Sequence, residues 1–236
     1  MLFHPLEKPV SDFAVVALNY IMPKFLHDVW SRASLRICAD GGANRVNERY
    51  MNDKKHDFIF PDAVIGDLKS LDRKLWSELK NSGTEIIEIH NSYINDVEKA
   101  LRFLDDMNVK KPVILLGAFG GKMDQSMSAI HSMLAHPELE VYCLDDNNFS
   151  TWIRPGKTEI NASMKWTTEV CGLLPLHSPV KSISTQGLKW NLNGGSLSMG
   201  NFISTSNEII SSKIHISTSH PVFWTNQTAK NNKNGS

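Results

Sequence analysis

Residues 35–45 read LRICADGGANR, in which a short apolar run, Leu35–Ala39, ends in an acid and a pair of glycines. In two other stretches an apolar run also leads to glycine and an acid, AVIGD at 63–67 and VILLGAFGGKMD at 113–124. Short apolar runs that end at such residues and lead into helix-length segments are typical of the strands of βαβ units. The three stretches therefore predict a mostly parallel sheet.

Strands and helices are expected to alternate through the first 147 residues. The predicted strands are Phe13–Leu18, Leu35–Ala39, Ala63–Ile65, Glu85–Ile89, Val113–Leu116 and Glu140–Leu144. Helices are expected at Leu71–Ser82, Asp96–Met107 and Asp124–Ala135. In the second of these helices the apolar residues recur at helical spacing and form one face. We predict a three-layer α/β domain over residues 1–147, with helices on both faces of a parallel sheet.

The pattern changes after residue 147. Short strand-like runs separated by turn residues replace the helical periodicity, at Ser150–Ile153, Glu169–Leu174, Leu188–Leu192, Leu197–Ile203, Lys213–Ser217 and Val222–Thr225. Pro155-Gly156 and Gly200-Asn201 are among the turn signals between them. We predict a small all-β sandwich over residues 148–229, followed by a flexible polar tail over residues 230–236.

The composition argues against several classes of protein. The 236 residues include 25 basic and 25 acidic side chains, so the formal net charge is zero. This balance argues against nucleic-acid binding, which goes with a basic surplus, and no run reaches the roughly 18 apolar residues of a membrane span. Met1–Ser11 lacks the pattern of a signal peptide, and three widely spaced cysteines fit a reducing compartment. We expect a cytoplasmic protein with no membrane partner.

Acidic residues follow four of the predicted strands. Asp40 comes directly after its strand, Asp67 follows its strand after one glycine, and Asp96 and Asp124 lie a few residues beyond two others. The carboxyl ends of parallel strands share one edge of the sheet, where ligands bind. Carboxylates hold Mg²⁺, glycine pairs let backbone N–H groups approach phosphate oxygens, and Lys122 adds a positive charge. The sequence therefore predicts a site for a polyphosphate with a divalent cation.

Each of these motifs also has a purely structural interpretation. Asp40-Gly41-Gly42 is a good turn sequence, and Gly66-Asp67 ahead of a helix fits a turn with an N-cap. Asn95–Glu98 has the spacing of a capping box, in which Asp96 only favours the helix dipole. Gly120-Gly121 fits a tight strand-to-helix turn. Because no Walker A motif is present, the polyphosphate prediction rests on the convergence of the four loops.

A longer series of motifs runs through nearly the whole chain. Its members are ADGGANR (39–45), PD (61–62), GD (66–67), GGKMDQ (120–125), CGLLP (171–175), GLKWNL (187–192), STSN (204–207), HP (220–221) and WT (224–225). In content and order the series resembles the thiamine pyrophosphokinase family, and its animal and plant branch more than its bacterial one.

This resemblance implies a reaction in which the hydroxyl of thiamine attacks the β-phosphorus of ATP, so that thiamine diphosphate and AMP are formed. It also implies Mg²⁺ and a homodimer whose active sites are shared between the α/β domain of one subunit and the β domain of the other. The catalytic residues that it implies are Asp40, Asp67, Asp96, Lys122 and Asp124, of which the first three surround the metal. The implied nucleotide-binding residues are Gly41, Gly42, Asn44, Gly117, Gly120, Gly121 and Gln125.

The implied thiamine contacts lie late in the chain, at Ser204, Thr205, Ser206, Asn207 and Trp224. A flat, cationic ligand suits an indole face through stacking and cation–π attraction. Without the resemblance, Trp224 is interpreted as a core aromatic on a terminal strand, and Ser204–Asn207 as an ordinary polar turn.

Two segments depart from the family pattern. The family usually has Gly-Asp-x-Asp-Ser where this chain has Gly66–Ser70, so Lys69 replaces an acid. The next acidic motif, usually Asp-Gln-Asp followed by two residues and Asp, is here Asn91–Asp96, and Asn91, Ser92 and Tyr93 replace its first three residues. Three interpretations stay open: Lys69 substitutes for part of the missing metal charge, the chain binds thiamine or nucleotide without turnover, or the acceptor or donor has changed while the fold is kept.

Overall fold

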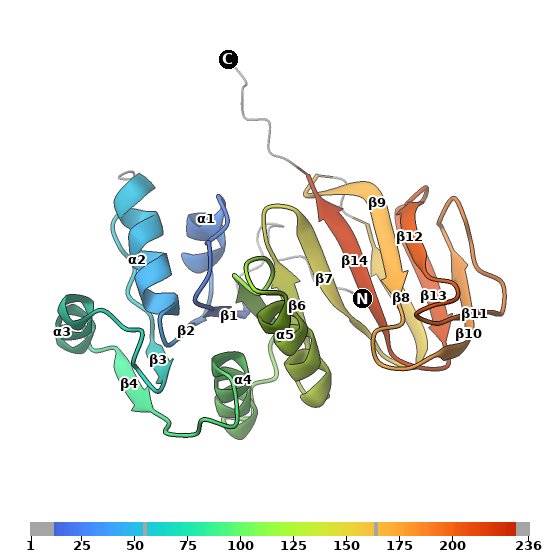
Figure 1. Ribbon diagram of the computed structural model, residues 1–236. Helices are drawn as coiled ribbons and strands as arrows, with labels where there is room; N and C mark the ends of the chain where they lie inside the picture. The colour runs from blue at the N-terminus through green and yellow to red at the C-terminus, as the bar shows by residue number, and fades with distance from the viewer. Residues whose placement is uncertain (1–11, 54–55, 163–164, 230–236) are drawn as a thin grey trace, which may run out of the picture. The chain divides into compact units, whose positions relative to one another are not determined.

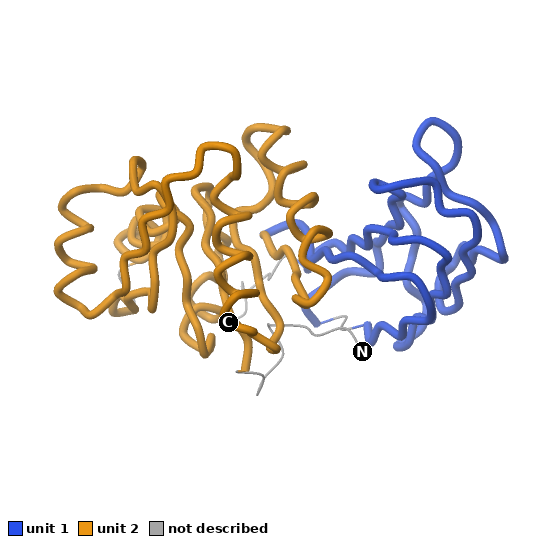
Figure 2. The backbone as a smooth tube through the Cα atoms, turned by 90° about the horizontal axis from the view of Figure 1, so that it is seen from below, with its two compact units in different colours: residues 1–4, 146–236 blue, residues 5–145 orange. Residues whose placement is uncertain are grey.

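The computed structural model describes residues 12–53, 56–162 and 165–229. The chain divides into two compact units, with the boundary after Asp145 (Figure 2). The predicted flexible tail, residues 230–236, lies outside the described residues. The first, the α/β unit, ends at Asp145, and the second, the β unit, begins at Asp146.

The α/β unit contains six parallel strands and five helices among its described residues. The strands are β1 (Ala14–Ala17), β2 (Leu35–Ala39), β3 (Ala63–Gly66), β4 (Glu85–Glu88), β5 (Val113–Leu116) and β6 (Val141–Leu144). The helices are α1 (Leu26–Trp30), α2 (Gly42–Asp53), α3 (Arg73–Asn81), α4 (Asp96–Asp106) and α5 (Met123–Ala135). The strands are ordered β6-β5-β1-β2-β3-β4 across the sheet, and every pair is parallel.

This strand order determines which helix covers which face. From β1 to β4 the chain advances in one direction across the sheet, and from β4 it crosses back to β5 and β6. Because crossovers between parallel strands are right-handed, helices from the two directions lie on opposite faces. Figure 1 shows α1 and α2 on one side of the strands and α4 and α5 on the other. The predicted three-layer α/β architecture is confirmed.

Local hydrogen bonds explain where two of the helices begin. The Asp72 carboxylate accepts from the backbone N–H groups of Lys74 and Leu75 and so caps α3. The interpretation of Asp67 as the N-cap is therefore wrong, because the capping acid comes five residues later. Asn95 accepts from the backbone N–H of Glu98 at 2.8 Å and caps α4, as its spacing predicts.

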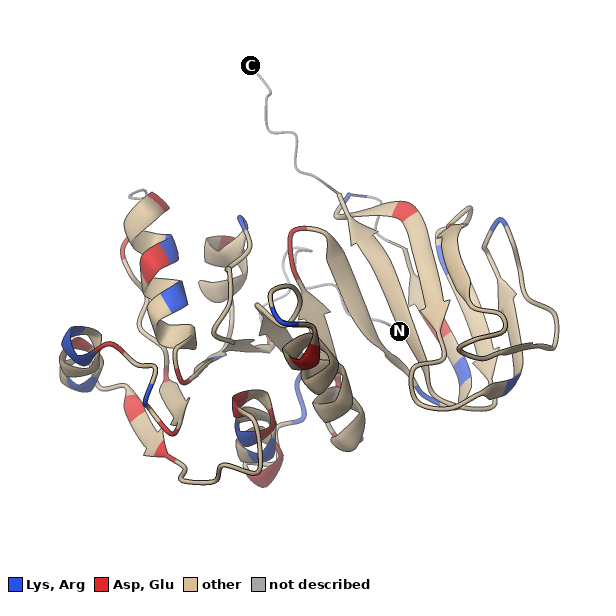
Figure 3. Cartoon of the chain, in the orientation of Figure 1, with Lys and Arg blue, Asp and Glu red and all other residues tan. Residues whose placement is uncertain are grey.

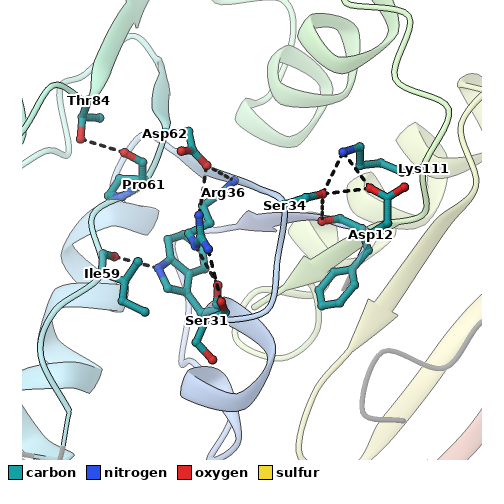
Figure 4. A network of polar contacts seen from close by, with 11 residues as sticks. Asp12, Ser31, Ser34, Arg36, Ile59, Pro61, Asp62, Thr84 and Lys111 are labelled. Carbon is teal, nitrogen blue, oxygen red and sulfur yellow. Dashed lines mark hydrogen bonds and ion pairs between the residues drawn. The ribbon is translucent and has the colours of Figure 1, made fainter. Parts of the chain in front are cut away.

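Residues at the amino ends of the strands form a polar network on the edge opposite the loops that carry the predicted site (Figure 4). Arg36 donates its backbone N–H to Asp62 at 2.6 Å and its guanidinium lies 3.6 Å from the same carboxylate. Lys111 bridges Asp12, at 3.0 Å, and Ser34, at 2.8 Å. These contacts join the residues ahead of β1, β2, β3 and β5, so this edge stabilises the sheet.

Gly42 lets α2 approach β1 closely, and replacing it is expected to destabilise the protein. A Cβ atom at this position would lie 2.1 Å from the carbonyl oxygen of Ala17, which is backbone and has no rotamer to move. We expect Gly42→Ala to lower the free energy of unfolding by about 1–3 kcal/mol, the usual cost of overpacking. Urea unfolding measures this difference.

Gly195 supplies the matched control for that measurement. A Cβ atom there meets nothing within 4 Å, so Gly195→Ala is expected to change stability by less than about 0.5 kcal/mol. Equal effects of the two substitutions would contradict the steric argument for Gly42.

The β unit contains eight antiparallel strands among its described residues. They are β7 (Asn148–Ile153), β8 (Gly156–Asn161), β9 (Thr167–Leu174), β10 (Val180–Gln186), β11 (Gly195–Leu197), β12 (Ser204–Glu208), β13 (Lys213–Thr218) and β14 (Val222–Thr228). Strands β12-β9-β14-β7 are neighbours in one layer and β11-β10-β13-β8 in the other. Side chains of both layers, including Leu173, Ile214 and Trp224, form a single buried cluster. The predicted β sandwich is confirmed.

Two predicted strands of the β unit are wrong. Leu188–Leu192 is a turn, because the Asn191 side chain accepts from the backbone N–H of Leu188 at 3.1 Å and holds the chain in a bend. Leu197–Ile203 is strand only at Leu197, and pairing resumes at β12. Strands β8, β10 and β12 were not predicted. Their many polar residues, such as STSNE in β12, hide the apolar pattern.

No helix in the described part of the chain is long and apolar enough to cross a membrane.

Candidate active site

A cavity of about 450 Å³ opens at the carboxyl ends of the parallel strands. It is lined by Leu18 and Asn19, which follow β1, and by Gly117 and Ala118, which follow β5. These two neighbouring strands are the point at which the strand order reverses, since the chain continues to β2 on one side and to β6 on the other. A switch point of this kind is where open α/β sheets bind their ligands.

Asp40 lies buried beside this cavity in a strained backbone conformation. It directly follows β2, its φ is +46°, and its side chain is 3% exposed. Its Oδ1 accepts from the backbone N–H of Ser70 at 3.2 Å. Burial, together with the nearby charges of Asp96 and Asp67, raises the pKa of Asp40 above its ordinary value. Three acids predicted from the sequence are thus brought close enough to influence one another.

Asp67 lines the cavity and is paired with Lys69. Lys69 Nζ donates to Asp67 Oδ2 at 2.8 Å, and the backbone N–H of Lys69 donates to Oδ1 at 3.2 Å. These hydrogen bonds from Lys69 lower the pKa of Asp67 to about 2. Asp67 therefore stays ionised through the whole range in which the enzymes of a cell work.

Asp96 lines the same cavity from the first turn of α4 and is paired with a lysine that the sequence analysis missed. Lys99 Nζ donates to Asp96 Oδ1 at 2.9 Å, and its side chain is only 4% exposed. Lys99 itself lines the cavity. An ammonium group buried at a ligand cavity can contact phosphate oxygens directly. Its position three residues after Asp96, on the same side of a helix, is the signal that identifies it.

The glycine loop after β5 reaches the cavity through Gly117 and Gly120, and Gln125 and Ser128 of α5 line it as well. Gly117, Gly120 and Gly121 all have positive φ. A Cβ atom on Gly120 would lie 2.6 Å from the ring of Tyr20, and one on Gly121 would lie 2.7 Å from it. The two glycines are thus needed for close packing on Tyr20, which the sequence analysis did not single out.

Several predicted residues lie near the cavity without lining it. Lys122 and Asp124 are exposed at the start of α5. Gly41 and Gly42 lie buried where α2 begins. The amide of Asn44 is bonded at both ends, to the Ser70 carbonyl at 2.6 Å and to the backbone N–H of Asp72 at 3.0 Å. Asn44 therefore joins α2 to the segment that carries Asp67.

Two residues between β4 and α4 that differ from the family pattern line the cavity. Asn91 and Ser92 line it, and the Asn91 side chain accepts from the backbone N–H of Tyr93 at 2.9 Å. Tyr93 points away into solvent and is 97% exposed. Figure 3 shows both signs of charge distributed over the helices and loops of this unit, so the gathering of three acids is a local feature of the cavity.

Comparison with known proteins gives a consistent result along the chain. The catalytic domain of thiamin pyrophosphokinase matches residues 26–143, and the vitamin B1 binding domain of thiamin pyrophosphokinase matches residues 157–223. Thiamine pyrophosphokinase 1 of Oryza sativa subsp. japonica is 33% identical, over 94% of this chain and 89% of that protein. The chain belongs to the thiamine pyrophosphokinase family.

More distant matches extend over most of the chain. Thiamin pyrophosphokinase 1 of Caenorhabditis elegans is 23% identical, over 84% of this chain and 80% of that protein. The solved thiamin pyrophosphokinase from Candida albicans superposes with a TM-score of 0.82 at 21% identity, and the superposition covers 92% of this chain and 90% of that one. The thiamine pyrophosphokinase fold is therefore present in both units.

Within this family member, the predicted thiamine contacts lie in the β unit. Thr205 and Ser206 line a small hollow of about 140 Å³, and Ser206 has a φ of +54°. Ser204 and Asn207 are buried in β12, where Asn207 donates to the Trp190 carbonyl at 2.9 Å. Ser204–Asn207 is therefore strand, and the polar-turn interpretation is wrong.

Trp224 lies in the interior of the β unit. It is 1% exposed and belongs to the buried cluster between the two layers. This burial favours the interpretation of Trp224 as a core aromatic. Its predicted contact with thiamine stays a prediction.

The acids at the cavity fit Mg²⁺ by their chemistry. In the part of the chain that the structure describes, no group of three His, Cys, Asp or Glu side chains is placed so that it could hold a metal ion by itself. Mg²⁺ does not need one, because it keeps several waters and shares its other positions between one or two carboxylates and substrate phosphates. Asp40 and Asp67 provide hard oxygen donors, and a divalent cation bound by them would offset the repulsion from Asp96 and Asp67 that contributes to the raised pKa of Asp40.

Proposed function

We propose that the protein transfers pyrophosphate from ATP to the hydroxyl of thiamine, giving thiamine diphosphate and AMP. The observation that carries the proposal is the cavity at the switch point between β1 and β5, lined by Asp67, Asp96 and Lys99. It lies in the unit that matches the family's catalytic domain, and a second unit matches the vitamin B1 binding domain.

The chain's own groups supply most of what such a transfer needs. Transfer of a phosphoryl-type group depends on positioning and on stabilising the negative charge spread over phosphate oxygens. Lys99 offers a buried ammonium group at the cavity, and the N terminus of α5 offers backbone N–H groups next to the glycine loop. Asn95 and Gln125 add neutral polar groups to the lining, which can orient the nucleotide.

Asp40 and Asp67 would hold Mg²⁺, with Asp96 on the lining of the same cavity as Asp67. When bound, the ion would neutralise charge on the phosphates and polarise the phosphorus under attack. The role of the three acids is then to hold that charge in a fixed place, which the strained backbone at Asp40 and the cap at the start of α4 both favour.

AMP release from ATP by the purified protein tests this function, with and without thiamine and with and without Mg²⁺. We expect AMP to appear only when thiamine and Mg²⁺ are both present. Thiamine binding without AMP would instead establish the alternative of a ligand-binding member without turnover. The comparisons give no support to that alternative, since the curated proteins matched are named as pyrophosphokinases.

We also propose that the protein is a homodimer in the cytoplasm. The resemblance to the family supports the dimer and the composition supports the compartment. Light scattering after gel filtration would give the mass of a single 26.5 kDa chain if the dimer proposal is wrong.

A further inference from the structure

Lys69 donates hydrogen bonds to both oxygens of the Asp67 carboxylate at the cavity. Its Nζ lies 2.8 Å from Asp67 Oδ2, and its own backbone N–H lies 3.2 Å from Oδ1. Leu68, between the two residues, has a φ of +59°, a region that residues other than glycine rarely adopt. This turn folds the three-residue segment so that its two ends meet. Asp67 is therefore paired with a cation from its own loop, two residues further along the chain.

The pair is open to solvent and can separate. The Lys69 side chain is 80% exposed and that of Asp67 is 27% exposed. Exposed ion pairs are weak, whereas a lysine hydrogen-bonded to a phosphate makes one of the stronger contacts in proteins. Asp67 and Ser70, on either side of Lys69, line the cavity. A polyphosphate that enters it comes within reach of a long, flexible side chain that is held only loosely.

The ammonium also competes directly with a metal ion. A protonated amine cannot coordinate a metal, and its positive charge repels one. Mg²⁺ that binds Asp67 must therefore displace Lys69, and the displaced ammonium needs another partner nearby.

We propose that Lys69 exchanges partners when substrate binds: it holds Asp67 in the nucleotide-free protein and moves to a phosphate oxygen of ATP when Mg²⁺ takes its place. The inference rests on the proposed function, because it takes Mg²⁺ and ATP as the ligands. The consequence of this exchange is a coupling between the binding of Mg²⁺ and the binding of ATP. Each ligand favours the position of Lys69 that the other requires, so the two bind more tightly together than apart.

Isothermal titration calorimetry without thiamine tests the exchange on the full chain. Mg²⁺ is titrated into the protein alone, and ATP is titrated in the presence of saturating Mg²⁺. In Lys69→Met, Mg²⁺ alone is expected to bind about threefold to fivefold more tightly, since no ion pair has to break. ATP is expected to bind about tenfold more weakly, since a charged hydrogen bond to phosphate is lost.

Lys74→Met is the matched control, because it removes an exposed lysine from α3 of the same unit. The proposal is overturned if Lys69→Met binds both ligands as Lys74→Met does. It is equally overturned if Lys69→Met binds Mg²⁺ more tightly with no loss of ATP affinity, since Lys69 then only blocks the metal. The titrations require no turnover, so they test the exchange alone. Thiamine-dependent AMP release by the unsubstituted protein tests the proposed function separately.

Discussion

Replacing Asp40 with asparagine is expected to lower kcat/KM by about 10²–10³-fold, the usual effect of removing one electrostatic group from a reacting centre. Asparagine has nearly the same shape and tolerates positive φ, so the +46° conformation is kept. Its side-chain oxygen can still accept from the Ser70 N–H. The substitution therefore removes charge and little else. Steady-state AMP formation at saturating Mg²⁺ measures the loss.

The same substitution is expected to raise the temperature at which the protein unfolds. Burial and the charges of Asp96 and Asp67 raise the pKa of Asp40 in the folded protein, so its ionised form is less favourable there than in the unfolded chain. That penalty is fully present above the folded pKa and disappears below the ordinary value of an aspartate. Asp40→Asn should therefore be more stable than the unsubstituted protein at neutral pH, and the difference should vanish in acid.

Asp106→Asn is the control for both measurements, because Asp106 is exposed at the far end of α4 from the cavity. It is expected to change neither activity nor unfolding temperature appreciably. If Asp40→Asn lost activity and stability together, the carboxylate would be needed for the fold. That result would contradict the prediction that Asp40 is kept for function at a cost in stability.

Most strands of the α/β unit could be predicted closely because they are buried on both faces, whereas the edge strand β4 is partly exposed. Leu35–Ala39 and Val113–Leu116 are strands with the predicted bounds, since short, mostly apolar runs ending in glycine or acid leave few alternatives. The start of α2 at Gly42 was less evident. Asp40–Asn44 has the composition of a loop, and only the contact with Ala17 shows why a glycine begins the helix.

The β unit and part of the cavity depend on contacts that single segments do not reveal. Buried polar residues such as Asn207 are tolerated in β12 because a distant turn at Trp190 supplies their hydrogen bonds. Lys99 has the sequence of a solvated helix residue, and its burial follows from the pairing with Asp96 inside the cavity. Tyr20 gains its role only when the loop after β5 folds over it.

Trp224→Ala is expected to lower the free energy of unfolding by about 3–5 kcal/mol, the cost of removing a large buried aromatic. Trp224 lies opposite Leu173 of β9 and Thr151 of β7, inside the cluster that joins the two layers of the β unit. The surrounding structure relaxes only partly around a cavity of that size. Chemical denaturation measures the loss, and Trp190→Ala, at a tryptophan that is 53% exposed, should cost less than about 1 kcal/mol.

A second substitution at the same position separates the core role from a contact with thiamine. Trp224→Leu keeps an apolar side chain in the interior but removes the aromatic face. If Trp224 serves only the core, the KM for thiamine stays within about twofold of the unsubstituted value at a temperature where both proteins are folded. If the indole stacks on thiamine, loss of an attraction of about 0.5–2 kcal/mol raises that KM by roughly twofold to thirtyfold. The second result would mean that the β unit opens around Trp224 when thiamine binds, because the indole is otherwise enclosed.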